Sequence, residues 1–175
     1  MTKSAQIKSQ GFTLIELLVV ISLIGLLASV ILVSLNSSRV KARDTVRKQT
    51  LRQLQKGLEF YYNQIGSYPV TPVNCCSSEP GDPWHPQDDW IPGLEPSYIS
   101  KLPRDPLGGI SPICAGPRYR SYLYQSDSDG KNYKLYAYCS PEGAMTDDPS
   151  DPFYSPGAWW YTWRVCGGTS DCNSW

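Results

Sequence analysis

An unbroken apolar segment constrains this chain more than any other feature. Residues 12–35 read FTLIELLVVISLIGLLASVILVSL and contain a single charged side chain, that of Glu16. About 20 apolar residues are enough to cross the hydrocarbon core of a bilayer as a helix. A secretory signal peptide has a shorter apolar core, of about 7 to 15 residues, without a carboxylate inside it. The sequence therefore predicts a membrane-spanning helix over residues 12–35.

The carboxylate of Glu16 needs an explanation of its own. A lone ionised carboxylate within a bilayer costs on the order of a few kcal/mol, and it is retained where it has a partner or a function. No Lys or Arg lies within the apolar segment, so a cation would come from another chain or from a new amino terminus nearby. Alternatively, Glu16 stays hydrated at the membrane interface, because it lies only one helical turn inside the segment.

The helix is expected to continue well beyond the apolar segment. All 15 prolines lie at Pro69 or later, so nothing before that residue interrupts a helix. Apolar side chains then recur every three or four residues, as in an amphipathic helix: Leu51, Leu54, Leu58, Tyr61 or Tyr62, and Ile65. Gly66 followed by Pro69 is typical of a helix end. The sequence predicts one helix over about residues 13–64.

Charge is separated along the chain although its formal sum is zero. Residues 39–59 carry seven basic and two acidic side chains, whereas residues 67–175 carry thirteen acidic and seven basic ones. A neutral total gives no general attraction to nucleic acid, and no nucleic-acid partner is predicted.

The N-terminal sequence resembles a known family. KSQGFTLIELLVVISLIGLLASV is similar to the leader and helix of type IV prepilins and type II secretion pseudopilins, and IGSYP, YISKLPRDPLGG and DGKNYKLYAYC resemble stretches of major pseudopilins. The resemblance implies that a prepilin peptidase cuts between Gly11 and Phe12 and N-methylates Phe12. It also implies that Glu16, then the fifth residue, meets the terminal amine of a neighbouring subunit during assembly.

The resemblance divides the chain into four parts and implies an α+β pilin fold. The parts are a leader (1–11), a transmembrane helix (12–35), an amphipathic extramembrane helix (36–66) and a globular β head (67–175). The basic run at 39–56 either forms a solvated face beside anionic lipid head groups or pairs with the acidic heads of neighbouring subunits.

The head is expected to be a small antiparallel sheet packed on the helix. Two Tyr-rich runs in YRSYLYQSDSDGKNYKLYAYCS are joined by residues 127–130, and Asp-Gly between such runs predicts a hairpin. In WWYTWRVC, the side chains of Trp159, Tyr161, Trp163 and Val165 alternate with the others, as in a half-buried strand. The many aromatic side chains form either a small core or a surface that stacks on a sugar or a protein partner.

Six cysteines predict a disulfide framework whose connectivity the sequence does not define. They are Cys75, Cys76, Cys114, Cys139, Cys166 and Cys172. Zinc is a poor alternative, because no Cys-x-x-Cys pair is present and His85 is the only histidine.

Calcium is the one metal that the resemblance suggests, because major pseudopilins bind it in a C-terminal loop. In TDDPSDP the possible ligands are Asp147, Asp148 and Asp151, whose carboxylates are the hard oxygen donors that calcium prefers. An acidic surface loop containing proline explains the same residues equally well.

The functional prediction is a structural subunit of a type IV pilus-like or type II secretion pseudopilus filament. The alternative is a minor, tip-located adhesin that binds a ligand through its aromatic head. An enzyme is not predicted, because no Ser/His/Asp set, phosphate loop or metal site of recognisable spacing is present. Expected partners are related subunits, prepilin peptidase, the inner-membrane assembly platform and membrane lipid.

The expected location is a single-pass membrane protein with a cytoplasmic N-terminus and an extracytoplasmic head, and then a filament in the periplasm or on the cell surface. The basic run after the apolar segment by itself favours the opposite orientation. Large domains are translocated with little regard to charge, however, and a cysteine-rich head suits an oxidising space.

Overall fold

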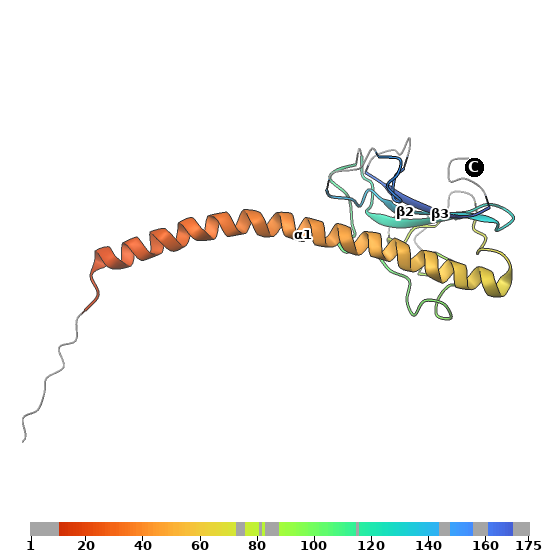
Figure 1. The fold of residues 1–175 in the computed structure, drawn as a ribbon, viewed down its shortest axis with the longest axis horizontal. Helices are drawn as coiled ribbons and strands as arrows, with labels where there is room; N and C mark the ends of the chain where they lie inside the picture. Colours follow the sequence, from red (N-terminus) through yellow and green to blue (C-terminus); the bar gives the residue numbers. More distant parts are fainter. Residues whose placement is uncertain are drawn as a thin grey trace, which may run out of the picture. The chain divides into compact units, whose positions relative to one another are not determined.

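The computed structural model describes residues 11–169 apart from 73–75, 81, 83–87, 115, 144–147 and 156–160, with the backbone alone at 32–34. In chain order the elements are α1 (Leu14–Ile65), β1 (Ser121–Ser126), β2 (Asn132–Tyr138) and β3 (Trp163–Gly168). The strands form one antiparallel sheet in the order β1-β2-β3, which confirms the predicted α+β class (Figure 1). The chain separates into two compact units, Met1–Arg39 and Val40–Trp175.

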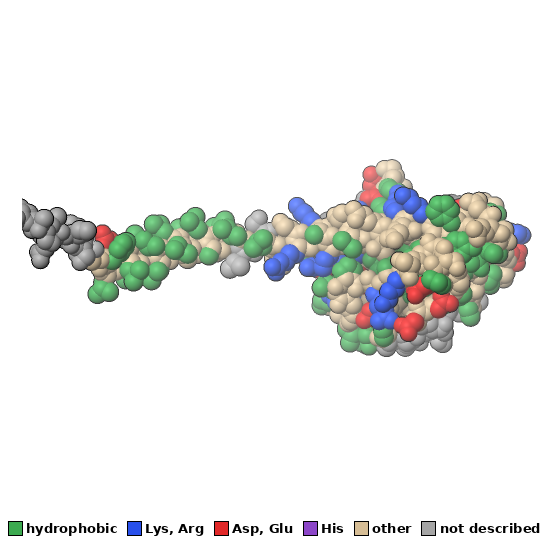
Figure 2. Space-filling view, turned by 90° about the horizontal axis from the view of Figure 1, so that it is seen from below, with side chains coloured by type: hydrophobic (Ala, Val, Ile, Leu, Met, Phe, Trp, Pro, Cys, Tyr) green, Lys and Arg blue, Asp and Glu red, His purple; other side chains and the backbone are tan. Residues whose placement is uncertain are grey.

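In the first unit, α1 is apolar on all sides. Large hydrophobic side chains from Leu14 to Ile31 are between 45% and 88% exposed, and Figure 2 shows them covering the visible face of this part of the helix. This stretch is long and apolar enough to cross a membrane, and none of it is buried. A helix that is hydrophobic all round is stable inside a protein or a bilayer, not in water.

In the second unit, α1 lies against the sheet through the predicted apolar stripe (Figure 1). Leu51, Leu54 and Leu58 are completely buried, and Tyr61 and Tyr62 pack against the same core. Ile65 does not belong to the stripe, because it is the last helical residue and its side chain is 58% exposed.

The end of α1 is fixed to the sheet by backbone hydrogen bonds. Gly66 has a φ of 86° and donates its N–H to the carbonyl of Tyr62 at 2.8 Å, as a glycine just beyond a helix often does. Tyr68 then donates its N–H to the carbonyl of Gly130 at 2.7 Å. The segment that leaves the helix is thereby joined to the turn between β1 and β2.

The predicted hairpin is present, and Asp127 organises its turn. The Asp127 carboxylate accepts hydrogen bonds from the N–H groups of Lys131 and Asn132 at 2.8 and 3.2 Å, and from the Asn132 side chain at 2.6 Å. Gly130 has a φ of 62°, and a Cβ added there would lie 2.6 Å from the carbonyl oxygen of Tyr68. A side chain is therefore excluded at this position.

The third strand, β3, begins at a later residue than the sequence predicts. Trp163 and Val165 are buried while Arg164 and Cys166 are partly exposed, which confirms the alternation. Tyr161 was expected in the strand, but its φ of 44° is not compatible with extended backbone and its side chain is 45% exposed. Trp159 lies outside the described residues.

Aromatic side chains form much of the core of the head, which favours the prediction of an aromatic core over that of a surface that stacks on a ligand. Tyr122, Tyr124 and Tyr133 are completely buried, and Trp90 is 1% exposed. Tyr68 packs edge-on against Tyr133 with ring centroids 4.6 Å apart, an arrangement that aromatic pairs prefer. The described aromatic residues thus hold the sheet and α1 together.

Leu54→Ala tests whether the stripe on α1 stabilises the head. Deleting this fully buried side chain is expected to lower the free energy of unfolding by about 2 to 5 kcal/mol, because burial energy is lost and a cavity remains. Urea denaturation of the detergent-solubilised protein measures the change. Gln53→Ala, at an exposed neighbouring position, should change stability by less than about 0.5 kcal/mol; equal effects of the two variants would contradict the packing.

Candidate functional site

The predicted cleavage junction lies just before α1. Residues 11–13 are not helical, and the helix begins at Leu14. The side chain of Phe12 is 81% exposed, and apart from its two chain neighbours no described residue has an atom within 4 Å of the position that a Cβ would take at Gly11. The Gly11–Phe12 bond is therefore sterically accessible.

Thr13 and Glu16 close the start of the helix by reciprocal hydrogen bonds. Glu16 Oε2 accepts from the Thr13 N–H at 2.9 Å and from Thr13 Oγ1 at 2.7 Å, and the Glu16 N–H donates to Thr13 Oγ1 at 3.3 Å. This is a capping box, in which two backbone donors left over at a helix start are satisfied. The role of Thr13 was not predicted, although the Thr-x-x-Glu spacing is its sequence signal.

The capping box satisfies hydrogen bonds of Glu16 without supplying a cation. Among the described residues, no Lys or Arg lies within ion-pair distance of its carboxylate. The positive end of the helix dipole favours an anion here, but it carries only a fraction of a charge. Within the described chain, hydrogen bonds to Thr13 thus hold the carboxylate of Glu16 in place, and no basic side chain compensates its negative charge.

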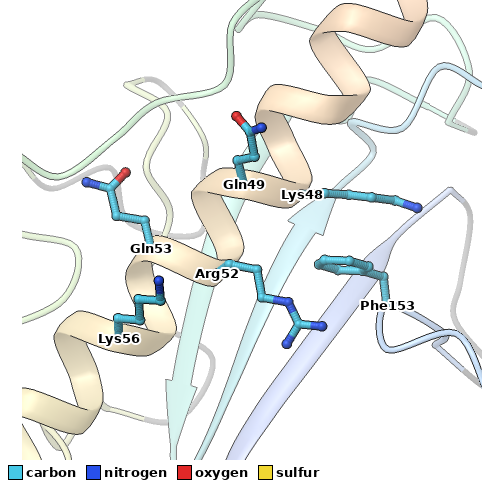
Figure 3. A pocket seen from close by; sticks show the side chains of 6 residues that line it. All are labelled: Lys48, Gln49, Arg52, Gln53, Lys56 and Phe153. Carbon is cyan, nitrogen blue, oxygen red and sulfur yellow. The ribbon is translucent and has the colours of Figure 1, made fainter.

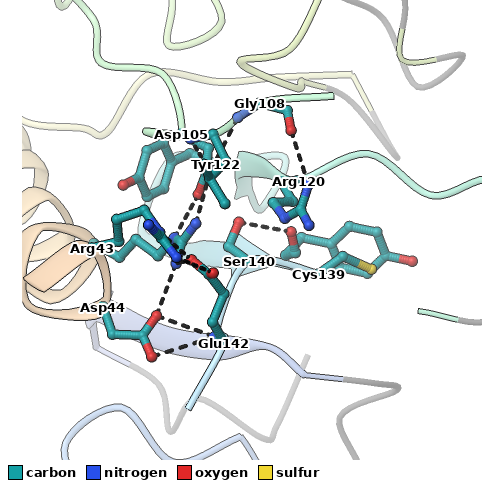
Figure 4. A network of polar contacts seen from close by, with 12 residues as sticks. Arg43, Asp44, Asp105, Gly108, Arg120, Tyr122, Cys139, Ser140 and Glu142 are labelled. Atoms are coloured by element: carbon teal, nitrogen blue, oxygen red, sulfur yellow. Dashed lines mark hydrogen bonds and ion pairs between the residues drawn. The ribbon is translucent and has the colours of Figure 1, made fainter. Parts of the chain in front are cut away.

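A second polar group, which we call the Arg47 cluster, connects α1 to the loops of the head (Figure 4). It consists of Arg43, Asp44 and Arg47 on the helix, with Asp105 and Glu142 from the head. Arg47 donates to both carboxylate oxygens of Asp105 at 2.7 and 3.0 Å, and to Asp44 and Glu142 at 2.8 and 2.7 Å. Arg43 holds Glu142 through two hydrogen bonds of 2.7 and 2.6 Å.

The centre of the Arg47 cluster is buried, and its other members are partly exposed. The side chains of Arg47 and Asp105 are both 0% exposed. Burial acts to raise the pKa of the Asp105 carboxyl, but the hydrogen bonds and positive charge of Arg47 hold that pKa below its ordinary value. The pKa of Glu142 is lowered chiefly by its hydrogen bond with Arg43. Breaking one partner of such a buried pair leaves an uncompensated charge.

The Arg47 cluster corrects the prediction for part of the basic run. Arg43 and Arg47 were expected on a solvated face or against neighbouring heads, whereas they pair with carboxylates of their own head. The sequence held a signal for this, because position 47 precedes Leu51 by one turn on the buried stripe. Arg52 and Lys56, by contrast, are exposed.

The predicted calcium ligands are only partly described. Asp148 accepts a hydrogen bond from the Ser150 N–H at 2.8 Å, and Asp151 accepts one from the Phe153 N–H at 2.8 Å. Asp147 lies outside the described residues, and those that are described contain no group of three acidic, His or Cys side chains suited to a metal ion. The calcium site stays a prediction.

The disulfide prediction is confirmed for Cys114 and Cys139, which are bonded to each other next to the end of β2. Cys76 and Cys166 are also in disulfide form. Cys75 and Cys172 lie outside the described residues.

Acid titration tests the Arg47 cluster. Because folding lowers the pKa of Asp105 and Glu142, their contribution to stability is fully present above the unfolded-state pKa of about 4 and is lost as pH falls through the lower folded-state values. Asp105→Asn should reduce the free energy of unfolding at pH 7 by about 3 to 5 kcal/mol and make its decline in acid less steep.

Denaturation of the detergent-solubilised protein between pH 7 and pH 2 measures both effects. Asp88→Asn is the matched control, because that side chain is 97% exposed. An Asp105→Asn variant with the stability and the acid profile of the control would contradict the role of the cluster.

Comparison with known proteins adds the following findings. The prokaryotic N-terminal methylation motif matches residues 7–32. The type II secretion system core protein G of Klebsiella michiganensis is 30% identical over 128 residues, which cover 69% of this chain and 84% of that protein. The protein of the same name from Pseudomonas aeruginosa is 30% identical over 129 residues, covering 71% and 87%.

A pilus protein is also similar over a shorter region. The type IV wide pilus major component PilA4 of Thermus thermophilus is 43% identical over 60 residues, which cover 34% of this chain and 46% of that protein. No solved structure matches the chain significantly.

Proposed function

Because the chain belongs to the family of the type II secretion system core protein G, a family of major pseudopilins, we propose that it is a structural subunit of a pseudopilus or type IV pilus-like filament. The observation that carries this proposal is the apolar part of α1, which is exposed all round. Such a surface requires lipid or other apolar helices around it. A subunit held in the membrane and then packed into a filament provides both.

We propose the expected orientation, with the N-terminus in the cytoplasm and the head outside it. The Cys114–Cys139 disulfide supports this arrangement, since such bonds persist in oxidising compartments. Before assembly the apolar part of α1 lies in the bilayer among lipids, and the inner-membrane assembly platform then transfers the subunit to the filament. The filament itself consists of identical or related subunits.

Processing at the N-terminus prepares the subunit for assembly. Residues 1–11 are the leader, prepilin peptidase cuts the Gly11–Phe12 bond, and the new amine of Phe12 is methylated. The exposed, non-helical junction supports this step, because a peptidase needs an accessible backbone. The new amine also places a cation at the N-terminus of each mature copy, four residues before its own Glu16.

Mass spectrometry of the mature protein tests the processing step. We expect a chain that begins at N-methylated Phe12 and lacks residues 1–11. Protein recovered from cells without prepilin peptidase should keep the leader and is the control. Assembled protein that still begins at Met1 would contradict the proposal.

The capping box makes a sharper test of Glu16 possible. Glu16→Gln keeps a side chain that can close the capping box, but it removes the anion that would meet the amine of a neighbouring subunit. Thr13→Ala keeps the anion and removes the hydroxyl that bonds to Glu16. We expect Glu16→Gln to be cleaved and inserted into the membrane normally while filament yield falls strongly.

Filament yield by electron microscopy, cleavage by mass spectrometry and membrane level by immunoblot measure these effects. The loss with Glu16→Gln should clearly exceed the loss with Thr13→Ala. Full assembly of Glu16→Gln would show that the carboxylate only caps the helix.

The alternative function, a tip adhesin with a ligand-binding aromatic head, gains no support from the described part of the head. Its largest aromatic side chains, among them Trp90, Tyr122 and Tyr124, are buried in the core. They cannot stack on a ligand without unfolding the head.

A further inference from the structure

A basic groove lies on the exposed side of α1 in the second unit (Figure 3). Its lining consists of Lys48, Gln49, Arg52, Gln53, Lys56 and Phe153, and its volume is about 430 Å³. The cations at 48, 52 and 56 are spaced four residues apart, so they lie along one face of the helix. Phe153 comes from the loop before β3 and forms an aromatic wall of the groove.

The cations of the basic groove differ from those of the Arg47 cluster in lacking close carboxylate partners. Among the described residues, no carboxylate lies within ion-pair distance of Arg52 or Lys56. Lys48 is 3.9 Å from Asp151, at the outer limit for an ion pair. By comparison, the ion pairs of Arg47 are 2.7 to 2.8 Å long.

Aromatic contacts hold two of these cations in place. The ammonium of Lys48 lies 5.1 Å from the centroid of Phe153 and 4.7 Å from that of Trp163. The guanidinium of Arg52 lies 4.9 Å from the Phe153 centroid. Side chains already ordered by such contacts lose less conformational freedom when they bind an anion. The groove is therefore preorganised for an anionic partner.

We propose that the basic groove binds the acidic surface of the head of a second copy of this chain. The inference rests on the proposed filament function, because it concerns a contact between subunits. Charge complementarity is its basis. Apart from the five members of the Arg47 cluster, which pair with one another, residues 39–59 carry five bases and one acid, a net charge of +4, and residues 67–175 carry seven bases and eleven acids, a net charge of −4. The described head displays exposed acids at Asp88, Asp89, Asp129 and Asp148. Asp88 and Asp129 form exposed ion pairs with Arg104 and Lys131, and exposed pairs of this kind are weak enough to exchange partners.

The symmetry of a filament supports this choice of partner. A contact that repeats along an open helical filament joins two different surfaces of the same subunit. Two basic grooves would repel each other, so the groove needs a partner surface of opposite charge. The same chain provides one on its head, and every subunit except those at the two ends of the filament can then use both surfaces.

Two single charge reversals in the full-length chain test the proposal. Arg52→Glu reverses a cation in the groove, and Lys101→Glu makes the same change at an exposed position of the head outside it. We expect Arg52→Glu to lower filament yield at least about tenfold at an unchanged level of processed protein in the membrane. Lys101→Glu should stay within about twofold of the parent chain, and an unchanged urea midpoint for both variants should show that the heads are folded.

The outcomes separate this inference from the proposed function. Filaments of normal yield from Arg52→Glu overturn the groove contact alone. Absence of filaments from the unaltered chain, in cells where other subunits of the machine are present, overturns the proposed function and the groove contact with it.

A photo-reactive residue in place of Gln53 identifies the occupant directly. Gln53 lines the groove and is exposed, so in assembled filaments the probe should capture a peptide from residues 67–175 of a second copy. Capture of α1 from a second copy, of phospholipid, or of an unrelated protein would each overturn the proposal, the phospholipid result assigning the groove to the membrane surface.

Discussion

The buried charge of Arg47 is the constraint on which the arrangement of the second unit depends. A guanidinium without access to water is stable only where carboxylates surround it, and here Asp105 and Glu142 come from loops far apart in the sequence. Both loops must therefore be in place before the pairing is complete. Burial of the hydrophobic stripe holds α1 against the sheet, but it does not by itself select one alignment of the helix along the sheet, because the hydrophobic effect is not directional. The hydrogen bonds of Arg47 supply that direction.

Much of the fold could be predicted because it follows from local patterns. The apolar segment, the repeat of Leu51, Leu54 and Leu58, and the Asp-Gly turn each report on residues close together in the chain. The helix was expected over about residues 13–64 and extends over Leu14–Ile65. The start of β3 was misplaced because Tyr161 adopts a positive φ, and an alternating pattern does not reveal such a local reversal.

The site was predictable only in part, for a related reason. The N-terminal motif singled out the Gly11–Phe12 junction and Glu16, whose roles stay predictions, whereas the basic run was treated as one surface. The structure divides it. Arg47 is buried and Arg43 is partly exposed, and both pair with carboxylates of the head, whereas Arg52 and Lys56 are exposed. Their partners lie about 60 to 100 residues away, so no window of sequence brings them together. Periodicity alone could have indicated that position 47 faces the core.

The apolar part of α1 has a thermodynamic consequence for a subunit that leaves a bilayer for a filament. Lipid tails are about as apolar as leucine side chains, so exchanging one for the other releases little hydrophobic free energy. The transfer is close to balanced for this surface, and it can run in either direction. In the proposed filament, the free energy of assembly then has to come from close packing between subunits and from polar groups that find partners there. In a filament built in this way, returning a subunit to the bilayer would cost little hydrophobic free energy.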